Sequence, residues 1–222
     1  MKKLCEGPDG LYYALLFQGG ITCFDKDIEK FLPVRFDKPL ELKDILDFCW
    51  NDGSLYLVTS QGLFESRIVR KTEGKHDFVL CLLNPEPVVR GKVAHLCSDG
   101  KTNLYFSVNQ RKVVHYDLVA KKTSLIKEYS VVNRLFLRHG YLWICRLWDD
   151  IICYDLKTNE ERVISMEGKD QSEFSNSYVT DLVLKDNRTF YLTTWNGLYK
   201  SVSYTHLTLP TIMTICVRVR LC

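Results

Sequence analysis

The sequence has no long apolar run and no block of like charge. Its 222 residues include no span of about 18 uncharged apolar residues, the length that a membrane-crossing helix needs. Lysine and arginine number 30 against 27 acids, so the formal net charge is +3, and no run of like charge exceeds three residues. Nucleic-acid-binding domains carry a concentrated basic patch, so we expect neither a nucleic-acid partner nor membrane contact in this stretch.

The familiar motifs of catalysis and cofactor binding are also missing. The sequence has no glycine-rich phosphate loop, no Gly-x-Ser-x-Gly and no cysteine and histidine paired in a recognisable catalytic context. Its five histidines are scattered, without a pair at metal-ligand spacing: His76, His95, His115, His139 and His206. The sequence therefore predicts no metal, no cofactor and no enzyme activity in this stretch, and it favours a binding module.

Cysteine is abundant but lacks the pattern of a disulfide framework. There are nine cysteines, an odd number, and no Cys-x-x-Cys occurs. We expect buried free thiols in predicted strands, because a free cysteine packs as a small apolar residue: Cys23, Cys49, Cys97, Cys145 and Cys153. Residues 1–7 begin with lysines but have no apolar central region, so we expect no signal peptide there.

What the sequence does contain is a repeated β-meander, clearest in residues 178–200. An alternating apolar strand there leads to a polar turn at 186–188, a second strand carries Tyr191, and Asn196-Gly197 turns into a third strand. The same order of strand, turn, aromatic strand and turn recurs in residues 45–64. Hairpin turns that join short strands predict an all-β fold without crossover helices.

The second strand of each copy carries one aromatic residue, which we call the anchor: Tyr12, Tyr56, Tyr105, Trp143 and Tyr191. Successive anchors are 44, 49, 38 and 48 residues apart. A period of about 45 residues with several short strands is typical of propeller blades, which stack because one meander cannot bury both faces of its sheet. We predict a partial β-propeller of about five units within residues 1–200, three of them complete. The first unit is predicted to lack its leading strand, and the fifth to end after its third strand. The five units are residues 9–40, 41–90, 91–128, 129–170 and 171–200.

This pattern resembles the two-component-regulator propeller repeat. The resemblance rests on an apolar strand, an Asp-Gly turn or its equivalent, Leu-Tyr or Leu-Trp, a strand ending in threonine, and Gly-Leu before an aromatic residue. It spans about residues 9–200, although Lys112-Val113 and Asp150-Ile151 replace Gly-Leu in the third and fourth units. It implies a sensor region on the periplasmic side of a hybrid histidine kinase, of the kind that commonly detects glycan breakdown products.

Residues 201–222 depart from this pattern. They contain no aspartate, glutamate or glycine, whereas the preceding 200 residues hold all 27 acids and all 12 glycines. Without the two arginines of this tail the net charge falls from +3 to +1. Residues 204–211 also resemble translated sequencing-adapter read-through. We predict that the tail is not native; the alternative is a genuine β-strand, since Ile215, Val217 and Val219 alternate.

The turn between the second and third strands is the candidate ligand surface. In three units it carries an aromatic residue four or five positions after the anchor, and its polar neighbours offer hydrogen bonds. Aromatic faces beside a few polar groups suit an oligosaccharide. The alternative is that each ring packs over the adjacent blade, and Ser60-Gln61 and Asn109-Gln110 occupy this turn in the other units. The candidate ligand-binding residues are Phe17, Trp148, Asp149, Asp150, Trp195 and Asn196.

Three functions remain open at this stage. The repeat favours a sensor propeller, whose partners would be an oligosaccharide ligand and the remaining blades of a larger parent protein. A protein-interaction scaffold would suit the free cysteines and the lack of a signal peptide, and it would place the chain in the cytoplasm instead of the periplasm. A propeller glycan hydrolase or lyase is the third, with no visible catalytic residues to support it.

Overall fold

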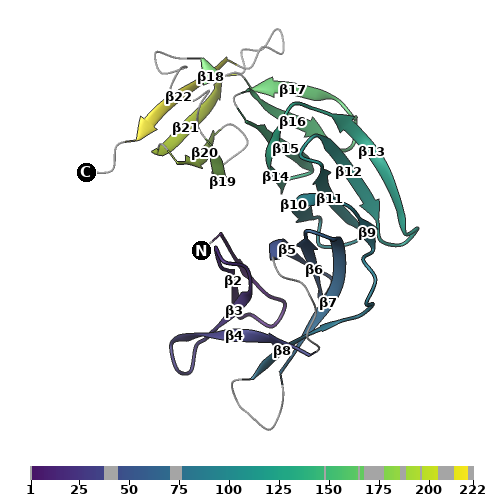
Figure 1. Cartoon of the computed structure of the whole chain (residues 1–222). Coiled ribbons are helices and arrows are strands. Elements are labelled where there is room, and N and C mark those ends of the chain that lie inside the picture. The colour runs from purple at the N-terminus through teal and green to yellow at the C-terminus, as the bar shows by residue number, and fades with distance from the viewer. Residues whose placement is uncertain are drawn as a thin grey trace. The chain divides into compact units, whose positions relative to one another are not determined.

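The computed structural model describes residues 2–37, 45–70, 77–147, 149–164, 166–167, 178–185, 189–195, 197–204 and 213–219. Strands and turns make up this part of the chain, and no helix occurs in it (Figure 1). It accordingly holds no helix that is long and apolar enough to cross a membrane. The prediction of an all-β, partial β-propeller fold is confirmed.

Residues 1–128 form one compact part with three blades, each a four-stranded antiparallel meander. Blade 1 comprises β1 (Lys3–Glu6), β2 (Tyr12–Leu15), β3 (Ile21–Asp25) and β4 (Lys30–Phe36). Blade 2 comprises β5 (Ile45–Asn51), β6 (Ser54–Thr59), β7 (Gly62–Arg70) and β8 (Phe78–Leu82), with the short β9 (Val89–Arg90) beside β7. Blade 3 comprises β10 (Val93–Ser98), β11 (Asn103–Val108), β12 (Lys112–Asp117) and β13 (Lys122–Glu128). A parallel pairing of β4 with β8 joins the sheets of blades 1 and 2.

Residues 129–222 form the second compact part, with two blades. Blade 4 comprises β14 (Val132–Arg138), β15 (Tyr141–Arg146), β16 (Ile151–Asp155) and β17 (Glu161–Ile164). Blade 5 comprises β19 (Val179–Leu184), β20 (Thr189–Thr194), β21 (Gly197–Tyr204) and β22 (Met213–Val219). The short β18 (Met166–Glu167) pairs with β22 in parallel.

An aspartate at the end of the third strand shapes the turn to the fourth strand in three blades. In blade 3, Asp117 Oδ1 accepts hydrogen bonds from the backbone N–H groups of Val119 at 2.8 Å and Ala120 at 2.9 Å. Asp25 and Asp155 accept the corresponding pair of bonds in blades 1 and 4. An aspartate that accepts hydrogen bonds from the backbone N–H groups of the following residues favours a tight turn over a longer strand.

The anchor aromatics occupy equivalent positions in four blades, because Tyr56, Tyr105, Trp143 and Tyr191 are each the third residue of a second strand. The choice of Tyr12 in blade 1 was wrong. Cys5 lies opposite Tyr13 as Cys49 lies opposite Tyr56, so Tyr13 is the equivalent residue. Tyr13 is buried and Tyr12 exposed, because successive side chains of a strand point to opposite faces.

The first unit also differs from the prediction in having a leading strand. β1 pairs with β2 from Lys3↔Leu15 to Glu6↔Tyr12, so blade 1 has four strands. Blade 5 has a fourth strand as well, because β22 pairs antiparallel with β21 from Leu198↔Val219 to Tyr204↔Met213. That strand lies within residues 201–222, where the alternation of apolar residues predicts one.

The buried cysteines are free, as expected. Among the cysteines whose side chains the structure describes, four are buried free thiols: Cys23, Cys49, Cys145 and Cys153. Cys97 is half-buried, which corrects its place among the core thiols. Burial raises the pKa of the Cys145 thiol to about 12 and that of the Cys153 thiol to about 11, because the charged thiolate is poorly solvated in the core.

Candidate functional site

The candidate residues lie in equivalent turns between the second and third strands. Phe17 lies between β2 and β3, residues 147–150 between β15 and β16, and Trp195 between β20 and β21. Trp148 and Asn196 lie outside the described residues. Ser60-Gln61 and Asn109-Gln110 occupy the same turn in blades 2 and 3, so the sequence alignment of the five turns is correct.

Trp195 is exposed and stacked on a second aromatic ring. Its side chain is 78% exposed, and its ring centroid lies 4.9 Å from that of Tyr178 at an interplanar angle of 23°. The backbone N–H of Trp195 donates to the Tyr178 carbonyl at 3.2 Å, and Thr194 Oγ1 donates to the Gly197 carbonyl at 3.1 Å. The stack and these two bonds hold the indole at the end of the blade with one face toward solvent.

The turn of blade 4 is held by an arginine. Arg146, whose side chain is mostly buried, donates from Nη1 to Asp149 Oδ2 at 2.6 Å and from Nε to the Asp150 carbonyl at 3.0 Å. Ser130 Oγ donates to the same Asp149 oxygen at 3.1 Å, and the Asp150 N–H donates to Asp149 Oδ1 at 2.8 Å. Both oxygens of Asp149 are thus engaged within the protein, so this carboxylate orders the turn.

The turn of blade 1 presents Phe17 to solvent. The side chain is 72% exposed, in a five-residue turn closed by backbone bonds between Leu16 and Gly20 and between Gly19 and Leu16, each 3.2 Å long. Gly19 and Gly20 both have positive φ, at 80° and 86°, which glycine adopts without a steric penalty. Within the described residues, neither Phe17 nor Trp195 packs as core.

Tyr178 belongs to the site but was not identified from the sequence. It precedes β19 by one residue, where an aromatic residue fits a strand start as well as a binding surface. Its pairing with a residue 17 positions later depends on the register of the β19–β20 hairpin, in which Val179 lies opposite Thr194. That register contains a bulge between Val179 and Asp181, which no sequence pattern indicates.

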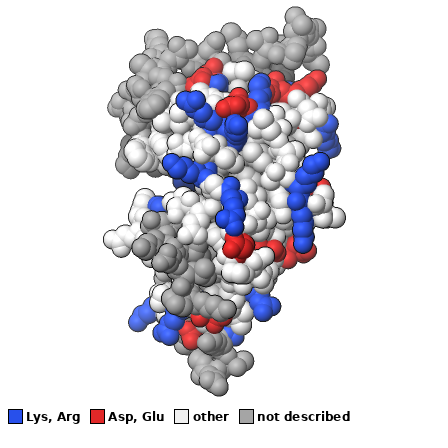
Figure 2. Space-filling model, turned by 45° about the vertical axis from the view of Figure 1, so that its right-hand side comes forward, with Lys and Arg blue, Asp and Glu red and all other residues white. Residues whose placement is uncertain are grey.

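The charges on the face drawn in Figure 2 do not single out another class of partner. Basic and acidic side chains are interspersed on the face drawn in Figure 2, without a patch of one sign. Across the part of the chain that the structure describes, no group of three or more histidine, cysteine or acidic side chains is placed to hold a metal ion. The aromatic turns are therefore the features with the most specific chemistry.

No protein-family model matches the chain, and no curated protein matches it. Solved structures do resemble it. An extracellular domain of BT4673 from B. thetaiotaomicron, assigned to a one-component system, has a TM-score of 0.69 and 14% identity over 99% of this chain and 30% of that chain. The extracellular domain of BT3049 of that bacterium, assigned to a hybrid two-component system, has a TM-score of 0.57 and 13% identity over 95% and 29%.

An auxiliary nutrient-binding protein from Bacteroides thetaiotaomicron is also similar, with a TM-score of 0.61 and 14% identity over 90% of this chain and 54% of that chain. The chain thus spans between 29% and 54% of the length of these three structures. At such low identity the likeness establishes a shared fold.

Proposed function

We propose that this chain is a segment of the ligand-sensing propeller of a hybrid two-component regulator, and that its ligand is a glycan-derived oligosaccharide. The repeat resemblance supports the sensor role, as does the structural likeness to extracellular domains assigned to one-component and hybrid two-component systems. The remaining blades of the parent protein would complete the propeller. A periplasmic location follows from this assignment.

The observation that carries the proposal is the exposed stack of Trp195 on Tyr178. Because the indole is already held by its stack on Tyr178, it loses little conformational entropy when a ligand binds. Its solvent-facing side can therefore contact the apolar face of a sugar ring. In the sequence, Phe17 of blade 1, Trp148 and Asp150 of blade 4 and Asn196 of blade 5 fall in equivalent turns of the repeat, so we include them in the proposed ligand surface.

Binding should be tested on the chain itself with a glycan array, followed by calorimetry with each oligosaccharide that binds. We expect Trp195→Ala to weaken binding at least about tenfold, or ~1.4 kcal/mol, and Tyr178→Ala to weaken it less, since that residue only supports the indole. Val163→Ala, which removes an exposed apolar side chain on β17, is the matched control. The proposal fails if no oligosaccharide binds, or if a folded Trp195→Ala variant binds as well as the control.

A protein-interaction scaffold is the second candidate, favoured by the free thiols. The buried free thiols of Cys23, Cys49, Cys145 and Cys153 suit a reducing compartment better than the periplasm. Expressing the chain in an oxidising compartment and counting its thiols with a maleimide under denaturing conditions would separate the two locations. Complete labelling of nine cysteines after periplasmic export would remove this objection to the sensor role.

A further inference from the structure

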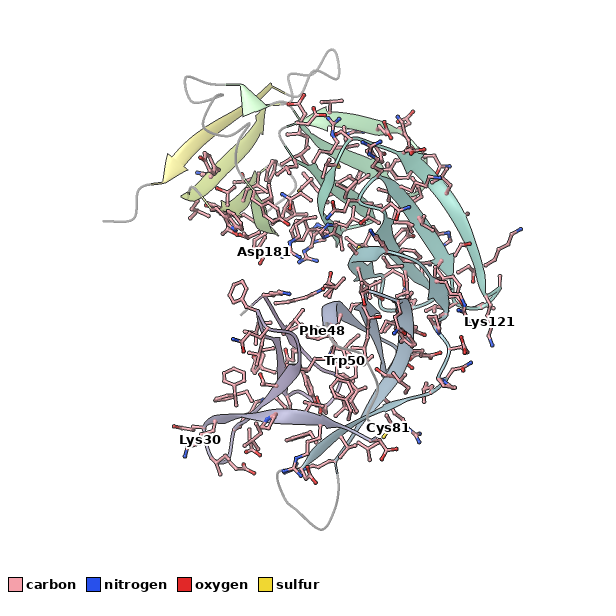
Figure 3. The ribbon with its side chains drawn as sticks, viewed as in Figure 1. Lys30, Phe48, Trp50, Cys81, Lys121 and Asp181 are labelled. Carbon is pink, nitrogen blue, oxygen red and sulfur yellow. The ribbon has the colours of Figure 1, made fainter. Side chains whose placement is uncertain are left out.

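A chain of hydrogen-bonded polar side chains crosses blade 3 from its first turn to its edge strand. Asp99 lies in the turn between β10 and β11, and Asn103 is the first residue of β11. His115 lies in β12, directly opposite Ser124 in β13, which is the edge strand of this sheet. Lys121, labelled in Figure 3, lies in the turn that leads from β12 into β13. All four polar residues therefore belong to one meander.

The carboxylate of Asp99 fixes the orientation of the Asn103 amide. Asp99 Oδ2 lies 2.6 Å from Asn103 Nδ2, and because an ionised carboxylate only accepts hydrogen bonds, the amide nitrogen is the atom that faces it. Although burial raises the pKa of Asp99, hydrogen bonds from the Asn103 side chain and from backbone N–H groups lower this pKa below its usual value. Asp99 is therefore ionised at neutral pH, and Asn103 Oδ1 remains as the acceptor for His115.

This amide in turn selects one tautomer of His115. The imidazole Nε2 lies 2.6 Å from Asn103 Oδ1, so Nε2 carries the proton and donates it. In the neutral ring Nδ1 then has a lone pair, and the Ser124 hydroxyl, 3.2 Å away, donates to it. The ring of Tyr105, a buried residue, stacks on the imidazole with centroids 5.2 Å apart at an interplanar angle of 26°. The imidazole is thus held by hydrogen bonds at both nitrogens and by a stacked ring.

The repeat itself does not require a histidine at this position. In the other four blades, the third-strand residue opposite the anchor position is a cysteine, a glutamate or a lysine: Cys23, Glu65, Cys153 and Lys200. The position of Ser124 is occupied by Leu32 in blade 1 and by Arg162 in blade 4. The histidine and serine pair is therefore a feature of blade 3 and not of the blade architecture.

This arrangement has the parts of an activated serine. A nucleophilic hydroxyl needs a base within hydrogen-bond reach and a third group that orients the base. His115 Nδ1 is the base for Ser124, and Asn103 orients the ring through a bond that strengthens when the imidazole gains a positive charge. Asp99 holds Asn103 in place. Because Ser124 is exposed, an electrophile can approach its Oγ.

We propose that Ser124 is a nucleophile that accepts an acyl group from an activated ester, with His115 as its general base. Ser124 Oγ attacks the ester carbonyl carbon while its proton passes to His115 Nδ1. The new bond from Oγ to carbon forms as the ester C–O bond breaks, and the imidazolium gives the proton to the departing alcohol. No oxidant or further reactant is needed. Asn103 and Asp99 are positioning residues, and none of the four lies in the turns of the proposed ligand surface.

Acetylation of the full chain by p-nitrophenyl acetate tests this nucleophile. Peptide mass spectrometry should follow the acetylation of Ser124 with time, with Ser130 as the internal reference, because Ser130 is an exposed serine that bonds to Asp149 instead of a histidine. We expect Ser124 to react at least about 100-fold faster than Ser130, the smaller contribution typical of a general base. His115→Gln should lower the rate at Ser124 to that of Ser130. Thr123→Ala, which removes the neighbouring exposed hydroxyl, is the matched control and should leave the rate unchanged.

Asn103→Ala tests the positioning role through a spectroscopic signal. Long-range correlation of the imidazole ¹H and ¹⁵N signals should show the proton of His115 on Nε2 in the wild type. In the variant both tautomers should be populated and acetylation of Ser124 should be slower. Circular dichroism should confirm that each variant is folded. The proposal is overturned if Ser124 reacts no faster than Ser130, or if folded His115→Gln keeps the wild-type rate. A wild-type proton on Nδ1 also contradicts it, because Nδ1 could then not accept the Ser124 hydroxyl.

Discussion

Asp47 shows how one side chain connects three blades. Its carboxylate bonds to Lys3 in blade 1, to its own strand, and to the Leu96 backbone in blade 3. Although burial alone lowers the pKa of the Lys3 ammonium, the charge of Asp47 and the hydrogen bond to it raise that pKa above its usual value. This role cannot be read from the sequence, because Asp47 stands inside an apolar run where the alternation indicates only a strand.

Asp47→Ala should lower the free energy of unfolding by about 3 kcal/mol, the lower end of the range for breaking a buried pair, since Lys3 is half-buried and regains some water. It removes the acceptor of the Leu96 N–H and the charged partner of the Lys3 ammonium, which keeps its hydrogen bond to the Leu96 carbonyl at 3.3 Å. Urea denaturation measures the change, with Glu6→Ala, an exposed acid on β1, as the control. A loss no larger than that of Glu6→Ala would show that the carboxylate does not join the blades.

The buried thiols predict a loss of stability at alkaline pH. The folded pKa of Cys145 is raised to about 12 and that of Cys23 to about 11, both by burial, above the value of about 8.5 in an unfolded chain. The neutral thiol is favoured in the fold, so the stabilisation is complete below the unfolded pKa and is lost as pH rises toward the folded one. Between pH 8 and 10, each such thiol should lower the free energy of unfolding by about 2 kcal/mol.

Comparing denaturation of the wild type and Cys145→Ala at these two pH values isolates one thiol. The variant should lose less stability over the interval than the wild type does, whatever its starting stability. An identical pH dependence in both proteins would mean that Cys145 ionises freely in the folded state.

Among the strands, the sequence predicts those whose turn and aromatic residues repeat from blade to blade. It does not predict features that depend on the pairing register of the strands. Polar turns and anchor aromatics indicate the second and third strands of every blade, and the Asp117 type of turn indicates the fourth. β1 was missed because its four residues, Lys-Leu-Cys-Glu, place two apolar residues between two charged ones, so they show no alternation, and no turn signal precedes them. The sequence does not distinguish Tyr12 from Tyr13 as the anchor, because both are tyrosine. The pairing of Tyr13 with Cys5 shows that Tyr13 is the one that faces the core.

The exposure of the candidate rings also depends on three-dimensional context. The position of Phe17 and Trp195 in equivalent turns follows from the repeat, whereas their exposure depends on whether a neighbouring blade reaches over the turn. Tyr178 joins the site through a bulged hairpin register, so it could not be assigned by spacing alone.

The tail gives a prediction at the same scale. If residues 201–222 are not native, blade 5 does not depend on β22, and removing residues 205–222 should change the free energy of unfolding by less than about 1 kcal/mol, or a few degrees in Tm. Thermal unfolding followed by circular dichroism measures this. A much larger drop in Tm would favour the alternative, a genuine strand that completes blade 5 through its pairing with β21.

At the scale of the whole molecule, one repeat supports both the fold and the proposed site. Blades stack because each meander leaves an apolar face for its neighbour, and the proposed ligand surface lies in the turns between the second and third strands. Propellers that share this architecture carry different functions, so the ligand must be argued from the turn residues. Trp195 and Tyr178 provide the most specific chemistry among them.

The four tryptophans of the chain allow the proposed ligand surface to be tested directly. Trp195 is exposed, whereas Trp143 is buried and Trp50 is half-buried against the core between blades 1 and 2. An oligosaccharide selected on the glycan array should be titrated into ¹⁵N-labelled protein, with the indole N–H signal of Trp195 assigned through Trp195→Phe. We predict that the Trp195 signal shifts with saturation while those of Trp50 and Trp143 stay in place. A binding oligosaccharide that leaves the Trp195 signal unmoved would contradict the account.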